Sequence, residues 1–151
     1  MNVLFLDIDG TLTPLSSRGI VGTPWVVQAS LGTITVNEEI RHRLRELQLR
    51  GVTIIWTTLW EEAAEEVAEG LMLEYSGHLS LLIDGIPDFK SRCIENYLKN
   101  HPEITQSIWT DDHIEDDEKE YAENAGVKVM SIDPIIGLTV EDLDEIEQYL
   151  T

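Results

Sequence analysis

Cysteine and long apolar runs are both scarce in this 151-residue chain. Cys93 is the single cysteine, so no intrachain disulfide can form, and a reducing cytoplasm is the expected compartment. No apolar stretch approaches the roughly 20 residues that a membrane-spanning helix requires. The N-terminus also lacks the basic segment that precedes the apolar part of a secretion signal. We therefore expect a cytoplasmic protein without a membrane partner.

Positive charge is the other shortage. The chain has 10 Lys and Arg against 29 Asp and Glu, a formal net charge of -19. A field of this sign repels nucleic acids and anionic membranes, so we expect no surface for long nucleic acids. Seven of the acidic residues are concentrated between residues 111 and 120, opposed only by Lys119, and we interpret that segment as a solvated helix face.

Apolar runs of strand length alternate with segments of helical periodicity along the whole chain. Hydrophobic residues make up 42% of it, enough for the core of one domain spanning residues 1–151. We expect strands near 3–6, 52–56, 79–83, 108–110 and 127–132, and helices near 38–50, 61–75, 90–99, 115–125 and 140–150. Asn37 and Thr139 are the expected N-caps. This order predicts an α/β fold with a mainly parallel sheet covered on both faces.

The segment from Pro14 to Thr35 follows the first strand and differs from the rest. It carries several Gly and Pro residues around two short alternating stretches, 25–27 and 34–36. That pattern is typical of a small hairpin, which we call the flap, about residues 14–35. It is too short to form a separate domain.

Two aspartates stand at the end of the first apolar run. Asp7 and Asp9 follow Val3 to Leu6, and Asp9-Gly10-Thr11 is a strong turn signal. Both carboxylates should therefore emerge at the C-terminal edge of the sheet, where open parallel α/β sheets bind their ligands.

Three further features lie at predicted strand ends or helix starts: Thr57-Thr58, Lys90 and Asp111-Asp112. With Asp7-x-Asp9 they resemble, in order, the four motifs of the haloacid dehalogenase (HAD) superfamily, in its phosphohydrolase branch. The resemblance implies a Rossmann-like three-layer sandwich with a minimal cap. It also implies that Asp7 is a nucleophile, and that the backbone carbonyl of Asp9 binds the metal.

The residues themselves favour the same chemistry. Carboxylates that converge in one crevice repel by about 4 kcal/mol per pair at 4 Å and an effective dielectric of 20, so the cluster requires a cation. An all-oxygen site suits Mg²⁺, and the candidate metal ligands are Asp7, Asp111 and Asp112, to which the resemblance adds Asp9.

Candidate catalytic residues follow from the needs of phosphoryl transfer. Asp7 can attack phosphorus and form an aspartyl-phosphate, while Asp9 protonates the leaving oxygen and later activates water. Donors for the phosphoryl oxygens are Lys90, the hydroxyl of Thr58, preferred over Thr57, and backbone N–H groups from Ile8 through Asp9 to Gly10.

Each feature alone has an ordinary structural explanation. Leu82-Ile83-Asp84-Gly85 repeats the strand-Asp-Gly pattern without a second acid, so such a turn is no catalyst by itself. The threonines could satisfy a strand end, Lys90 could be a surface lysine, and Asp111-Asp112 could cap a helix. The occurrence of all four features in this order at strand ends argues against that account. Trp60 could stack on a base, although packing is the favoured role.

A narrower resemblance concerns residues 56–61, 108–112 and 136–139. These are similar to the small HAD domains of bacterial RNA-repair proteins, which usually read W-A-T-T-W where this chain has a different threonine register. We predict a Mg²⁺-dependent phosphomonoesterase, with a nucleotide or nucleic-acid terminal phosphate as the favoured substrate in an open crevice. The alternative is a catalytically inactive phosphate-binding or protein-interaction module that keeps the fold.

Overall fold

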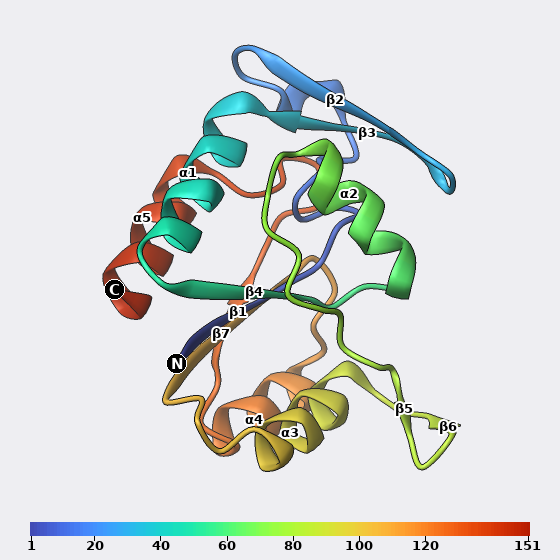
Figure 1. Ribbon diagram of the computed structural model, residues 1–151, viewed down its shortest axis with the longest axis vertical. Helices are drawn as coiled ribbons and strands as arrows, with labels where there is room; N and C mark the ends of the chain where they lie inside the picture. Colours follow the sequence, from blue (N-terminus) through green and yellow to red (C-terminus); the bar gives the residue numbers. More distant parts are fainter.

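A four-stranded parallel sheet forms the centre of the computed structural model, which describes all 151 residues (Figure 1). Its strands lie in the order β4-β1-β7-β8. Their bounds are β1 Asn2–Leu6, β4 Val52–Trp56, β7 Gln106–Asp111 and β8 Lys128–Ser131. Because all four strands run in the same direction, their C-terminal ends meet at one edge. The predicted α/β class is confirmed.

Both faces of the sheet are buried by helices. On β1, Leu4 and Leu6 point into one apolar cluster, and Val3 and Phe5 into another. The first cluster includes residues from α1 Glu38–Leu49, α2 Ala64–Gly70 and α5 Val140–Leu150. The second includes residues from α3 Lys90–Asn100 and α4 Asp116–Asn124. The predicted three-layer sandwich is therefore present, with the sheet between the two groups of helices (Figure 1).

The flap is an antiparallel hairpin of β2 Pro24–Ala29 and β3 Gly32–Asn37, as the sequence predicts. It is fixed to α2. The indole Nε1 of Trp25 donates to the carbonyl oxygen of Gly70 at 2.9 Å, and Ser30 at the hairpin tip donates to Glu66. A Cβ on Gly70 would lie 2.4 Å from Cγ1 of Val27, so the close approach of flap and helix depends on this glycine.

The strand predicted at 79–83 does not join the central sheet, and only residues 82–83 of it form a strand. Only a single bridge, between Trp56 and His78, joins this segment to the sheet edge, and Leu79 N–H donates to the Trp56 carbonyl. The chain then forms a small hairpin of β5 Leu82–Ile83 and β6 Ile86–Pro87. Asp84 and Gly85 both adopt positive φ, the conformation of a two-residue hairpin turn, and this turn reverses the chain before a fifth sheet strand can form.

The helix expected at 61–75 is shorter, because a 3₁₀ turn η2 Glu61–Ala63 precedes α2 and the helix ends at Gly70. Met72 takes a φ of 56° and Leu73 N–H donates to the Ala68 carbonyl, a Schellman-type end in which methionine occupies the usual glycine position.

The two predicted caps have different outcomes. Thr139 forms a complete capping box with Asp142 at the start of α5. Asn37 makes no cap bond to α1; its side chain instead accepts from Val21 N–H and donates to the Gly19 carbonyl, which ties down the base of the flap. No helix in the structure has both the length and the apolar character to cross a membrane.

Candidate active site

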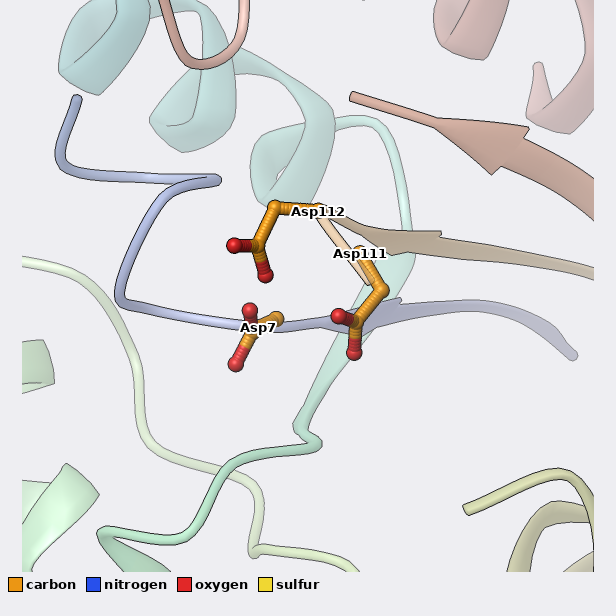
Figure 2. A group of neighbouring side chains, drawn as sticks. All are labelled: Asp7, Asp111 and Asp112. Carbon is orange, nitrogen blue, oxygen red and sulfur yellow. The ribbon is translucent and has the colours of Figure 1, made fainter. Parts of the chain in front are cut away.

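Strand register brings the acidic residues together. Leu6 at the end of β1 pairs with Thr110 on β7, so the next residues, Asp7 and Asp111, leave adjacent strands side by side. Asp112 follows directly. One carboxylate oxygen from each of the three lies within 4.8 Å of the others, and Figure 2 shows the three carboxylates turned toward one space. Asp7 and Asp111 are buried, and Asp112 is partly exposed.

Lys90 compensates part of this charge. It is the first residue of α3, and its Nζ lies 2.6 Å from Oδ2 of Asp111 and 3.3 Å from Oδ1 of Asp7. When all three carboxylates are ionised, the one ammonium leaves two uncompensated negative charges. A divalent cation would balance them.

The burial and crowding of these charged groups shift their pKa values. The pKa of Asp7 is raised to about 7, with burial as the largest cause. The Lys90 ammonium lowers this pKa, and the Asp111 carboxylate raises it. Burial also raises the pKa of Asp111. For Lys90, burial lowers the pKa of the ammonium, but the Asp7 and Asp111 carboxylates outweigh that effect and raise it. Without a metal ion, the site therefore holds its negative charge poorly.

The turn after β1 is shaped to leave room for these groups. Gly10 has a φ of 76°, and a Cβ there would lie 2.4 Å from Oδ2 of Asp112. The hydroxyl of Thr11 donates to Oδ2 of Asp7 at 3.2 Å. Behind the turn, Leu138 N–H donates to the Thr11 carbonyl at 2.8 Å, so segment 136–139 supports the turn that carries the aspartates.

The predicted phosphate donors differ in availability. The Gly10 N–H donates within its own turn to the Thr13 carbonyl, whereas the Asp9 N–H has no partner in the chain. The Ile8 backbone N–H acts on the Asp7 carboxyl group and lowers its pKa, against the larger effect of burial.

The two threonines after β4 also differ. Thr57 donates its hydroxyl to the Ile55 carbonyl at 3.1 Å, and is therefore engaged. The Thr58 hydroxyl instead accepts from Trp60 N–H at 3.2 Å, which leaves its own proton to donate. Of the two hydroxyl groups, only that of Thr58 therefore has a proton without a partner in the chain.

Asp9 stands apart from the three clustered aspartates. Its residue is exposed, and its Oδ2 accepts a hydrogen bond of 2.9 Å from the indole Nε1 of Trp60. Sequence reasoning assigned Trp60 to packing and missed this contact. The position of Trp60 two residues beyond the candidate phosphate ligand was the available signal.

A family model described as the HAD domain in Swiss Army Knife RNA repair proteins matches residues 3–143. The chain belongs to this HAD family. No curated protein matches the chain. Among solved structures, the HAD domain of the effector protein Lem4 from Legionella pneumophila is similar in fold, with a TM-score of 0.64, 16% sequence identity, and coverage of 99% of this chain and 95% of that one.

The HAD fold is a phosphatase-type fold, and its members typically use Mg²⁺. The residues present fit that ion. Every ligand atom that they offer is a carboxylate oxygen, and the three carboxylates converge from the ends of two adjacent strands. Their negative charge exceeds that of the one ammonium beside them, as a site for a dication requires. Asp7, Asp111 and Asp112 are the side chains that would hold it.

Proposed function

We propose that this protein is a Mg²⁺-dependent phosphomonoesterase that works through an aspartyl-phosphate on Asp7. The observation that carries the proposal is the position of Asp7. Asp7 is buried, and one of its carboxylate oxygens lies within 4.8 Å of an oxygen of Asp111 and of Asp112. Its carboxylate also contacts the Lys90 ammonium. Two residues later, Asp9 is exposed. The groups proposed as nucleophile, compensating cation and proton donor thus lie at one sheet edge, which supports the proposal.

In the first half-reaction a carboxylate oxygen of Asp7 attacks phosphorus. The bond between phosphorus and the ester oxygen breaks, its electron pair moves to that oxygen, and Asp9 supplies the proton. Bound Mg²⁺ would offset the repulsion between the Asp7 carboxylate and the phosphate. Lys90, the Thr58 hydroxyl and the Asp9 N–H would donate to the phosphoryl oxygens, whose charge grows in the transition state.

In the second half-reaction Asp9, now ionised, takes a proton from a water molecule that attacks the phosphorus. The bond between phosphorus and the Asp7 oxygen breaks, which releases inorganic phosphate and restores both aspartates. An exposed position suits Asp9 for this work, because both the leaving group and the attacking water reach the site from solvent.

For the substrate we propose a phosphate on a nucleotide or a nucleic-acid end. The insertion after β1 consists of the flap, so a protruding phosphate can enter without displacing a large cap. The family description refers to RNA repair, and a terminal phosphate is the part of an RNA that the net charge of -19 opposes least.

An aryl-phosphate assay with and without Mg²⁺ tests the activity. We expect Mg²⁺-dependent release of phosphate from p-nitrophenyl phosphate, and a fall of at least about 1,000-fold in kcat for Asp7→Asn with the fold retained. Asp84→Asn is the control, because Asp84 is also an aspartate of an Ile-Asp-Gly turn, like Asp9, but lies in the β5–β6 turn and outside the carboxylate cluster. An inactive wild-type protein would instead support an inactive binding module.

A panel of nucleotides, sugar phosphates and oligonucleotides phosphorylated at the 3′ or 5′ end tests the substrate class. We expect the highest kcat/KM for nucleotides or oligonucleotide ends. A preference for sugar phosphates would contradict this part of the proposal and leave the chemistry of Asp7 intact.

A further inference from the structure

The segment from Thr58 to Glu61 is a tight turn that touches two parts of the candidate site. The Thr58 hydroxyl accepts from the Trp60 backbone N–H at 3.2 Å, and the Thr58 carbonyl accepts from the Glu61 N–H at 3.2 Å. Glu61 has a φ of 49°, which non-glycine residues rarely adopt and which costs about 1–3 kcal/mol. Backbone strain of this kind persists only where the surrounding structure holds it in place.

The turn directs one side chain at the proposed acid–base residue. The indole Nε1 of Trp60 donates to Oδ2 of Asp9 at 2.9 Å, and this is the one side-chain hydrogen bond that Asp9 makes. The contact joins residues 51 positions apart, between the turn after β1 and the turn after β4. Trp60 is itself held, since it packs partly buried against the larger apolar cluster.

We infer that Trp60 is a positioning residue for Asp9, which fixes both the direction of its carboxyl group and the oxygen that carries the transferable proton. The inference rests on the proposed function. It goes beyond that function because it assigns a role to a residue outside the four motifs.

The physical reason lies in the donor-only nature of indole. Since the Trp60 N–H can only donate, it favours an Asp9 in which Oδ2 is the unprotonated oxygen and Oδ1 bears the proton. When the ester bond to phosphorus breaks, the Oδ1 proton passes to the leaving oxygen, which has received the electron pair of that bond. An exposed aspartate without this bond samples several rotamers, and most of them aim the proton elsewhere.

Leaving-group dependence separates positioning from general structural support. Departure of p-nitrophenolate needs little help from an acid, whereas departure of an alkoxide needs a proton. For Trp60→Phe we expect kcat/KM to fall at least about tenfold on glycerol 2-phosphate but only about twofold on p-nitrophenyl phosphate. The parameter kcat/KM is chosen because it covers the steps up to formation of the aspartyl-phosphate.

Trp25→Phe is the matched control. Its indole Nε1 also donates one hydrogen bond of 2.9 Å, but to the Gly70 carbonyl at the flap. We expect kcat/KM of this variant to change by less than about twofold on both substrates.

A double-mutant cycle tests whether Trp60 acts through Asp9, even where Trp60→Phe lowers stability. In an Asp9→Asn background, Trp60→Phe should leave kcat/KM on glycerol 2-phosphate unchanged. Equal losses on the two substrates, or additive losses in the cycle, would overturn the inference while the phosphatase proposal stands. A wild-type protein without phosphatase activity would overturn both.

Discussion

Asp7 and Asp111 occupy the same level of the sheet on adjacent parallel strands, one residue beyond the pairing of Leu6 with Thr110. Strands in a sheet lie about 4.8 Å apart, so this register alone brings two carboxylates to the spacing of a shared metal site. The Lys90 ammonium then contacts both. Strand pairing thus sets the spacing of the two carboxylates, and the start of α3 supplies the positive charge between them.

The stability of the metal-free protein should fall as pH rises from about 4 to about 7. The pKa of Asp7 is raised from 3.8 to about 7 in the folded protein, so the folded state binds a proton in that range that the unfolded state has lost. The stabilisation is complete below pH 4 and is lost as the pH passes 7. Thermal melts in EDTA across this range measure it.

Added Mg²⁺ should reverse that trend, because the ion favours ionised Asp7. We expect Mg²⁺ to raise the melting temperature more at pH 8 than at pH 5.5, since at the lower pH the ion must first displace a proton. Asp7→Asn should weaken both the pH dependence and the response to Mg²⁺. A response to Mg²⁺ that is the same at the two pH values would contradict the assignment of Asp7 as a ligand.

Replacing Lys90 should affect catalysis more than any other lysine substitution. In Lys90→Gln the ammonium that opposes the raised pKa of Asp7 is lost, together with a donor to the phosphoryl oxygens. We expect kcat/KM to fall about 100- to 1,000-fold. Lys99→Gln on the same helix is the control, because the Lys99 ammonium bonds only the Glu95 side chain at 3.2 Å near the surface. Similar losses for the two variants would refute a role of Lys90 in the site.

A methyl group at position 10 should disturb the metal site. In Gly10→Ala the new Cβ would lie 2.4 Å from Oδ2 of Asp112, and the backbone would also be strained at its φ of 76°. We expect Mg²⁺ affinity, measured by titration calorimetry, to fall at least about tenfold. Gly77→Ala is the control for strain alone, since Gly77 has a φ of 119° and no atom within 4 Å of a Cβ. It should lower stability but leave Mg²⁺ affinity unchanged.

The contact between flap and α2 predicts an unusual effect of alanine in a helix. Alanine normally stabilises a helix by about 1 kcal/mol relative to glycine. In Gly70→Ala, however, the added Cβ would lie 2.4 Å from Cγ1 of Val27, and we expect a net loss of about 1–3 kcal/mol in urea denaturation. The same change in a Val27→Ala background should be neutral or stabilising. Without that rescue, the packing explanation would be wrong.

The errors of sequence reasoning occur where a local pattern has two outcomes. Leu79 to Ile83 has the composition of a strand, but the following Asp84-Gly85 turn pairs its end with β6 rather than with the sheet. Asn37 is a good cap residue, yet its side chain is used by the flap base. In the first case the competing partner, β6, is only a few residues away. In the second it is the backbone of the segment around Gly19 and Val21. Hydrophobic periodicity does not indicate which of two possible partners a residue will bond.

By itself, the sequence determined the α/β class, the parallel sheet, the flap hairpin, and the placement of Asp7, Asp111 and Lys90 at element ends, because apolar periodicity and turn residues encode these locally. Only the tertiary structure decided that the Thr57 hydroxyl donates to a backbone carbonyl while the Thr58 proton has no partner. It also decided that the flap packs closely against α2 at Gly70, and that the Trp60 indole donates a hydrogen bond to Asp9. These are contacts between side chains or turns whose geometry depends on how separate elements pack, and no spacing along a single chain specifies that packing.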